Sequence, residues 1–216
     1  MRQLADDVFQ IPLIPRDGIN AYLLGDTLVD TGIPPSGKKL AKELGSRIQR
    51  IVITHAHGDH MGGAKHLKHA LGVPLLVGAK DAEPARTGVP ETKLGAFGRA
   101  TAGFAGVEVD TELAEGDTVG DFTVLETPGH SSGHISLWRE RDRVLVAGDV
   151  FFNMNIFTTM PGLRQPFGPF TFDPERNRES ERRLVELEPS VLLLGHGPPI
   201  TGAAEKLRAF AAKELS

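Results

Sequence analysis

Five times along this chain, a short apolar run ends in a turn that carries a histidine or an aspartate. The runs read as strands and the turns contain glycine or small polar residues, so each pattern predicts a strand followed by a sharp loop. Buried strands fix their ends rigidly, and such loops let polar groups from distant segments converge at one edge of a sheet. We therefore expect one site built from five places, at Asp30, residues 54–63, His130, Asp149 and His196.

The densest of these places is THAHGDHMGG, at residues 54–63, where three histidines and an aspartate fall within six residues. A solvated histidine-rich loop is the simplest interpretation of that segment alone. In an extended stretch, however, His55 and His57 point to the same side and can bind one ion. Asp59 and His60, where the chain turns into a helix, can face a second ion. The spacing thus favours two clustered ions.

The donors available across the five places indicate which metals would fit. They are five histidines and two aspartates, with Asp149 left to bridge: His55, His57, Asp59, His60, His130, Asp149 and His196. Nitrogen and oxygen donors in this mixture suit zinc, iron or manganese, whereas calcium and magnesium prefer more oxygen. The chain contains no cysteine, so neither thiolate ligands nor a cysteine nucleophile is available.

Strand and helix signals alternate along the chain and predict a mixed architecture. We expect a hairpin over 19–24 and 27–30, and further strands at 50–54, 73–78, 121–129, 134–140, 143–149 and 191–195. Helices are expected at 36–45, with a serine start and a glycine stop, and at 61–72, 174–189 and 202–216. Hairpins together with strand-helix units indicate mixed sheets with helices packed outside them. Residues 82–106 have weak periodicity and read as a helical or loop insertion.

Composition limits the class of protein. The 216 residues are 40% hydrophobic, enough for one sizeable core, so we expect a single domain over residues 1–216. The net charge of −4 disfavours binding to nucleic acid. The N-terminal residues contain Asp6, Asp7 and two prolines where a signal peptide needs an apolar core, and no later run reaches membrane-spanning length. We expect a cytoplasmic protein with a small-molecule substrate.

In order along the chain, the segments LVDTG, THAHGDHMGG, TPGHSSGH, AGDVFF and GHGPP resemble the motifs of the metallo-β-lactamase superfamily of metallohydrolases. The resemblance spans residues 30–196 and implies an α/β fold, a four-layer αββα sandwich of two mixed sheets. It further implies two divalent metal ions, with zinc favoured over iron or manganese. By the same resemblance, the residues that bind one metal are His55, His57 and His130, those that bind the other are Asp59, His60 and His196, Asp149 bridges the two metals, and Asp30 steadies the cluster from behind.

Two ions at such a site predict a hydrolase. A hydroxide held between them is a nucleophile at neutral pH, and one metal can polarise the substrate carbonyl and stabilise the oxyanion. Asp59 is the expected catalytic residue, since it can bind metal, hydrogen-bond the hydroxide and pass a proton to the leaving group.

The substrate class follows from which branch the motifs resemble. True β-lactamases of the superfamily often lack an aspartate in the role of Asp149, whereas the full set resembles glyoxalase II-type thioesterases and lactonases. We therefore expect hydrolysis of a small acyl thioester or ester. Glyoxalase II enzymes usually carry a helical glutathione-binding domain after the last ligand, and twenty residues follow His196 here. The alternatives are a lactonase, whose site tyrosine could only be Tyr22, and a persulfide dioxygenase-like oxidoreductase with one iron.

Three features have more than one interpretation. Residues 151–172 contain six of the eleven phenylalanines, with Met154 and Met160, and could form core, an apolar lip over the metals or the contact of a homodimer. His134 could orient the His130 loop or merely begin a strand, and we favour the structural role. His66 and His69 fall on the helix after the cluster, where a surface position is expected.

Overall fold

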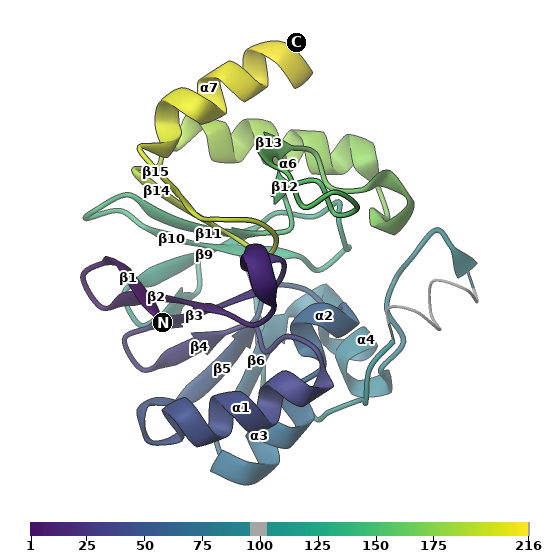
Figure 1. Ribbon diagram of the computed structural model, residues 1–216. Coiled ribbons are helices and arrows are strands. Elements are labelled where there is room, and N and C mark those ends of the chain that lie inside the picture. Colours follow the sequence, from purple (N-terminus) through teal and green to yellow (C-terminus); the bar gives the residue numbers. More distant parts are fainter. Residues whose placement is uncertain (96–102, 216) are drawn as a thin grey trace.

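Two mixed β-sheets stacked face to face form the centre of the structure, and helices cover the outer face of each sheet (Figure 1). The computed structural model describes residues 1–95 and 103–215. This arrangement is the four-layer αββα sandwich expected from the sequence.

The first sheet has seven strands, which follow one another in chain order. They are β1 (Arg2–Ala5), β2 (Val8–Pro12), β3 (Asn20–Leu24), β4 (Thr27–Val29), β5 (Arg50–Ile53), β6 (Leu75–Gly78) and β7 (Thr111–Leu113). Strands β1 to β4 are antiparallel, and β4 to β7 are parallel because a helix or a longer crossover separates each from the next. The helical segments of this half are η1 (Pro15–Asp17), α1 (Pro34–Leu44), η2 (Gly45–Arg47), α2 (Gly58–Met61), α3 (Ala64–Leu71), η3 (Ala79–Asp81) and α4 (Ala82–Thr87).

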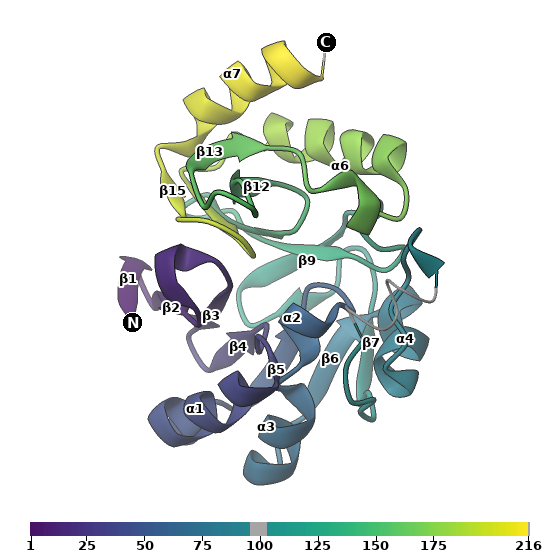
Figure 2. The same cartoon turned by 45° about the vertical axis from the view of Figure 1, so that its right-hand side comes forward.

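The second sheet has six strands in the order β15-β14-β11-β10-β9-β8. They are β8 (Thr118–Val119), β9 (Phe122–Glu126), β10 (Ile135–Arg139), β11 (Val144–Gly148), β14 (Val191–Leu194) and β15 (Ile200–Thr201). Helices α6 (Pro174–Glu186) and α7 (Ala203–Glu214) cover its outer face. A separate hairpin of β12 (Phe152–Met154) and β13 (Pro161–Arg164), followed by η4 (Gly168–Phe170), lies beside α6 and α7 and joins neither sheet (Figure 2).

Alternation along the strands produces three separate apolar layers. On β3, Leu23 faces the helices of the first half, whereas Tyr22 and Leu24 face the opposite sheet. On β11, Val146 lies between the sheets and Leu145 packs toward α6 and α7. Because successive side chains of a strand point to opposite faces, a strand buried on both faces is mostly apolar. The apolar residues of TLV, RIVI and VLVAG meet that requirement.

The structure corrects two helix boundaries. Helix α1 begins at Pro34, before the predicted Ser36, because a proline fits the first helical turn, where the missing N–H is not needed. The helix predicted over 61–72 is two short helices, α2 and α3, separated at Gly62 and Gly63. A Cβ on Gly63 would lie 2.9 Å from the Cα of Gly37 on α1, so the glycines let two backbones pack closely.

Three further observations concern the first strands, the segment 82–106 and membrane-spanning helices. Strands β1 and β2 were not expected, because their short apolar runs are interrupted by polar residues, Arg2 and Gln3 in β1 and Gln10 in β2. The segment 82–106 begins as α4, and its residues 96–102 lie outside the described residues. Within residues 1–95 and 103–215, no helix is both long enough and apolar enough to cross a bilayer.

Candidate metal centre

Every predicted donor follows the end of a strand, and the fold brings these ends together. The segment of residues 54–60 follows β5 of the first sheet, while His130, Asp149 and His196 follow β9, β11 and β14 of the second. The two sheets thus each contribute donors to a single centre between their edges, as the sequence predicted.

One group of donors consists of His55, His57 and His130, whose ligand atoms lie within 4.8 Å of one another. His57 Nδ1 is 3.0 Å from His130 Nε2, so the two rings direct a nitrogen at the same point. His55 Nε2 is buried and has no hydrogen-bond partner among the described residues. Three converging imidazole nitrogens, one of them unsatisfied, are suited to a transition-metal ion.

A second group consists of Asp59, His60 and His196, and a third of His55, His60 and Asp149, which overlaps both, within the same 4.8 Å limit. His196 Nε2 is 3.2 Å from Asp59 Oδ2, and His60 Nε2 is buried without a partner in the described part of the chain. The side chain of Asp59 is 36% exposed, whereas both histidines are buried. Asp59 therefore faces the open side of the centre.

Asp149 lies between the first two groups. Its Oδ2 is 3.2 Å from His196 Nε2, 3.4 Å from His60 Nε2, 3.5 Å from His130 Nε2 and 3.9 Å from His55 Nε2. Its Oδ1 is buried and unpaired within the described residues. One carboxylate is therefore within reach of donors from both groups, which is the position of a bridging ligand.

The backs of the rings are held by hydrogen bonds that fix their orientation. His60 Nδ1 lies 2.8 Å from Asp30 Oδ2, and His196 Nδ1 lies 2.6 Å from the carbonyl oxygen of Gly18. In each case Nδ1 donates its proton outward, so Nε2 is the nitrogen that points into the centre. Asp30, at a positive φ of 61°, also accepts hydrogen bonds from the backbone N–H and hydroxyl of Thr54. Asp30 thus lies behind the donors and holds the His60 ring in place.

Charge is unevenly distributed over the donors. Burial alone would lower the pKa of His196, but the Asp149 carboxylate outweighs it and raises that pKa to about 10. His60 behaves in the same way, with its pKa well above 6.5. Burial holds the pKa of His55 and of His130 well below 6.5, so both are neutral donors. Protons on His60 and His196 balance buried carboxylates that a bound cation would otherwise balance.

Comparison with known proteins agrees with this geometry. Residues 14–196 match the family described as the metallo-beta-lactamase superfamily. The chain belongs to that superfamily. The match includes every predicted donor, from His55 to His196.

Individual relatives within the superfamily span most of the chain. The probable metallo-hydrolase YflN of Bacillus subtilis is 32% identical over 204 residues, which cover 81% of this chain and 76% of the relative. A hydroxyacylglutathione hydrolase of Bdellovibrio bacteriovorus is 30% identical over 77% of this chain, and the match spans 62% of that enzyme. Among solved structures, TTHA1623 in a di-iron-bound form has a TM-score of 0.69 and 29% identity, covering 92% of this chain and 96% of that one.

One residue that supports this superfamily site was missed from the sequence. Asp81 is fully buried and accepts hydrogen bonds from the Ala56 N–H at 2.7 Å, the Ser131 hydroxyl at 2.7 Å and the Gly133 N–H at 2.9 Å. It therefore ties the loop of His55 and His57 to the loop of His130. The signal was present, because Asp81 follows β6 through Gly78 in the same strand, glycine, ionisable-residue pattern.

The remaining histidines and the only tyrosine, Tyr22, do not belong to the donor groups. The backbone N–H of Asp149 donates to His134 Nε2 at 3.0 Å, and His134 Nδ1 donates to the Thr127 hydroxyl at 2.9 Å, so this ring holds two loops together. Burial lowers the pKa of His134 to about 3, and the ring stays neutral. Tyr22 lies buried between the sheets and its hydroxyl donates to the Leu194 carbonyl, away from the donors. His66 and His69 are exposed, as predicted.

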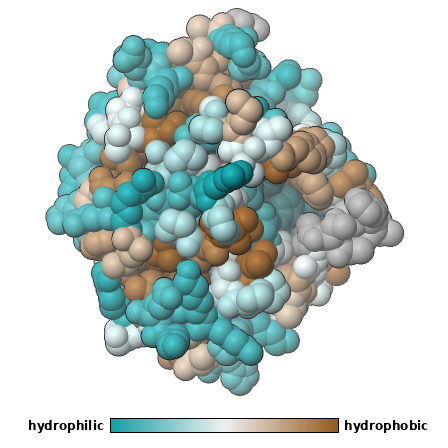
Figure 3. Space-filling model, viewed as in Figure 1, coloured by the Kyte–Doolittle hydropathy of each residue, from teal (hydrophilic) through white to brown (hydrophobic). Residues whose placement is uncertain are grey.

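A cavity of about 490 Å³ opens over the donors, and residues 151–172 contribute to its lining. Phe152, Met154, Phe167 and Phe170 line this cavity, and Phe151 is buried in the core under α7. Phe157 and Met160 are 73% and 66% exposed at the hairpin tip. The segment therefore serves both as core and as an apolar lip. Figure 3 shows apolar residues gathered in the middle of this face, between the two layers.

Proposed function

We propose that this chain is a dinuclear metal-dependent hydrolase that cleaves a small acyl thioester or ester. The observation that carries the proposal is the position of Asp149, whose Oδ2 lies 3.2 to 3.9 Å from the Nε2 atoms of four histidines. Those histidines belong to two donor groups, so one carboxylate can serve two ions.

The donors fit such a pair of ions. His55 Nε2, His60 Nε2 and Asp149 Oδ1 are buried polar atoms without partners in the described chain, a costly arrangement unless a cation satisfies them. We assign His55, His57 and His130 to one ion and Asp59, His60 and His196 to the other. With nitrogen and carboxylate donors and no sulfur, zinc is the first choice and iron or manganese the next.

Individual residues then have separate roles in the proposed reaction. Bound divalent ions supply a water-derived nucleophile at neutral pH and polarise the scissile carbonyl. Asp59 is the proposed catalytic residue, because its carboxylate faces the cavity and lies 3.2 Å from His196. It accepts the proton of the attacking water and delivers it to the leaving sulfur or oxygen. Asp30 and Asp81 hold the donor loops in place, so that little reorganisation is needed during the reaction.

The choice of a thioester or ester rests on the complete donor set and on the relatives. One relative is named a hydroxyacylglutathione hydrolase, which supports a thioester as the substrate. The match spans 62% of that enzyme, so its glutathione specificity is not carried over. The cavity of about 490 Å³ fits a small molecule. A lactonase receives no support from Tyr22, which lies outside the cavity.

The test combines metal analysis with a substrate panel. Protein purified without chelator should contain two transition-metal ions per chain and should hydrolyse small thioesters or esters faster than lactones, β-lactams or phosphodiesters. Asp149→Ala and Asp59→Ala should each lower kcat/KM by about 100-fold or more, on the scale of losing a catalytic group, while circular dichroism of the metal-free proteins stays unchanged. A stoichiometry at or below one after metal addition, or sulfite formation from a persulfide with oxygen uptake, would refute the assignment.

A further inference from the structure

The cavity over the metal centre has two apolar walls, which come from opposite ends of the sequence. The first wall comes from the start of the chain and consists of Ile14, Pro15, Ile19, Ile33 and Pro34. This wall is anchored to the centre itself, because the Gly18 carbonyl accepts from His196 Nδ1 and the Asp17 carbonyl accepts from the Gly197 N–H at 2.8 Å. The first wall therefore stands at a fixed distance from the donors.

The second wall is formed by Phe152, Met154, Ile156, Phe167 and Phe170, from residues 151–172. The ring of Phe152 lies 4.6 Å from that of His196, centroid to centroid, and Phe167 is 5.8 Å from Phe170. Contacts between these aromatic rings, and with the His196 ring, hold this wall against the metal centre.

A hydrogen bond joins the two walls at the exposed rim. Arg16 Nη1, next to Pro15 of the first wall, donates to the Thr159 hydroxyl of the hairpin at 2.8 Å. Both residues, like Asp17, hold a positive φ, between 54° and 61°, so the rim has a specific backbone shape. The separation of the walls is thus set both at the floor and at the rim.

Charged groups are confined to the floor. Among the described lining residues the ionisable side chains are His57, Asp59, His130, Asp149 and His196, all from the metal centre, and no lysine or arginine lines the cavity. A carboxylate or phosphate between the walls would lose hydration without gaining a cationic partner among the described lining residues. A hydrocarbon chain would instead bind with a favourable free energy, because its apolar surface leaves water.

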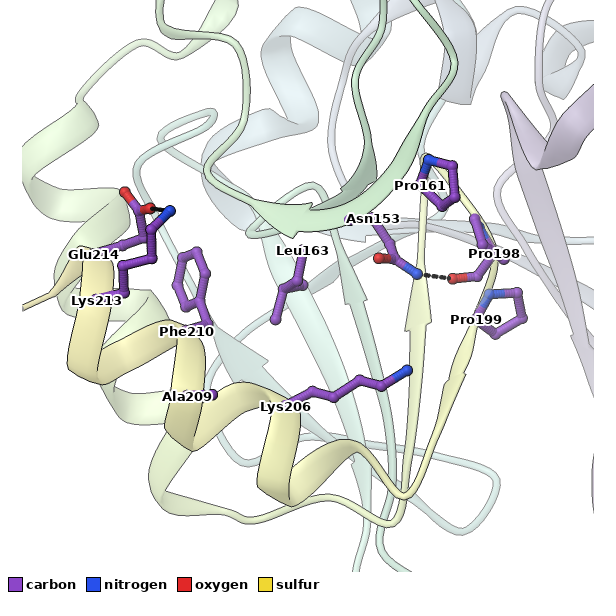
Figure 4. Close-up of a pocket in the computed structure, with 11 residues that line it drawn as sticks. Asn153, Pro161, Leu163, Pro198, Pro199, Lys206, Ala209, Phe210, Lys213 and Glu214 are labelled. Atoms are coloured by element: carbon purple, nitrogen blue, oxygen red, sulfur yellow. Dashed lines mark hydrogen bonds and ion pairs between the residues drawn. The ribbon is translucent and has the colours of Figure 1, made fainter.

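The neighbouring cavity differs in that lysines line it. It measures about 590 Å³ and lies on the other side of the β12–β13 hairpin, against α7 (Figure 4). Lys206 and Lys213 of α7 line it, together with Glu214, which pairs with Lys213 at 2.6 Å, and with Asn153 and Leu163 of the hairpin. Side chains alternate along a strand, so Phe152 and Met154 face the metal centre while Asn153 between them faces away. The hairpin therefore separates an apolar cavity from one with cationic residues.

From these walls we propose that the hydrolase selects a neutral aliphatic acyl group, which lies between the wall of residues 14–34 and the wall of residues 152–170. This inference rests on the proposed function and adds the class of acyl group to it. The polar leaving group then extends to the rim, near Arg16. Because the cavity is finite, catalytic efficiency should rise with acyl length and level off once the cavity is filled.

The first experiment measures kcat/KM for acetyl, butyryl and hexanoyl thioesters of one leaving group, with metal content fixed. Each methylene should raise kcat/KM by about fourfold, the factor expected for burying one methylene. Phe167→Ala and Ile14→Ala, one from each wall, should reduce the gain to below about twofold. Leu163→Ala changes the same hairpin on its opposite face and should keep the wild-type slope. A flat series in the wild type, or a preference for succinyl over butyryl, would overturn the inference.

A binding experiment separates this inference from the proposed function. Non-hydrolysable alkyl thioethers of the same lengths should bind with an affinity that rises by about fourfold per methylene in the wild type and less in Phe167→Ala. Length-dependent binding without hydrolysis of any thioester would retain the apolar cavity and refute the thioesterase. Hydrolysis that is independent of length would retain the thioesterase and refute the acyl selectivity.

Discussion

At the scale of single residues, Asp81 determines how the donor loops are held. Its carboxylate accepts three hydrogen bonds, from Ala56, Ser131 and Gly133, in a fully buried position. Asp81→Ala leaves those donors unpaired, so the free energy of unfolding should fall by about 2 to 4 kcal/mol. Metal affinity should fall by about 10- to 100-fold, because the loops of His55 and His130 lose their common support.

Urea unfolding and competition with a chelator would measure the two effects of Asp81→Ala. Asp26→Ala is the matched control, because Asp26 also follows a strand but pairs with Arg50 at the surface, where its side chain is 47% exposed. Exposed ion pairs contribute about 0 to 1 kcal/mol, and metal affinity should not change. Equal metal affinities of the two variants would show that Asp81 stabilises the fold alone.

Glu181 makes the free energy of unfolding depend on pH. Burial raises its pKa from 4.5 to about 7, while Gln165 and Asn177 each donate a hydrogen bond to it. Between these two pH values the folded protein keeps a proton that the unfolded chain has lost. Stability therefore falls as pH rises from 4.5 to 7, by up to about 3 kcal/mol, and the loss is complete above that range.

Glu181→Gln removes the ionisation. Relative to the wild type, the metal-free variant should therefore be more stable at pH 8 than at pH 5. Urea unfolding of both proteins at the two pH values gives the comparison, and groups common to both cancel. Glu179→Gln, on the exposed face of the same helix, should show no such difference. A constant gap between Glu181→Gln and the wild type across this range would contradict the assigned ionisation.

At the scale of elements, helix α6 links its own stability to the position of His130. The Asp173 carboxylate caps the helix by accepting from the Arg176 N–H at 3.1 Å. The N–H groups of Phe172 and Asp173 donate to the carbonyls of His130 and Gly129. The start of the helix is therefore also the outer support of the His130 loop.

Asp173→Ala should lower the free energy of unfolding by about 0.5 to 2 kcal/mol, the usual cost of losing a helix cap. Thermal melting of the metal-free protein tests this value. Glu175→Ala, in the first turn of the helix at an exposed position, serves as the control and should cost less than about 1 kcal/mol. Equal costs for the two variants would show that the cap contributes nothing beyond helix charge.

The elements predicted correctly from the sequence are those with a clear hydrophobic pattern. RIVI, VLVAG and VLLL are nearly continuous apolar runs because both faces of their strands are buried, and all three are strands. Strand β1 alternates Arg2, Gln3 and Leu4 at a sheet edge, and β12 and β13 pair only with each other, so neither has a comparable pattern. The break between α2 and α3 depends on contact with Gly37 of α1, a tertiary constraint that local periodicity does not contain.

At the scale of the whole molecule, the metal centre joins the two sheets. Asp59 and His60 belong to the first sheet's edge, whereas Asp149 and His196 belong to the second. Bound ions should therefore stabilise the native state, which alone assembles these donors, by about 4 kcal/mol at free metal 1,000-fold above Kd. Thermal unfolding with metal and with chelator measures the increment, and Asp149→Ala should lose most of it. An unchanged melting temperature would mean that no specific site forms.

The convergence of the donors could be predicted from sequence because each is a histidine or an aspartate near a strand end, in a fixed order. Apart from Asp30, the supports were harder to predict, because several of them are backbone groups. The Gly18 carbonyl that orients His196 lies 178 positions earlier, and no local pattern marks a carbonyl for that role. Likewise, the cavity has one wall near residue 14 and another near residue 170, a pairing that only the packed sheets create.

The β12–β13 hairpin has a consequence for how the protein could change over generations. Residues 151–172 form one wall of the cavity, yet they contain no histidine, aspartate or glutamate and pair with neither large sheet. Mutations there can reshape what enters the cavity while the strand ends that carry the donors are inherited intact. Selectivity can thus diverge in a single short segment under a constant reaction centre, and the same segment is where a protein engineer would graft a new acyl preference.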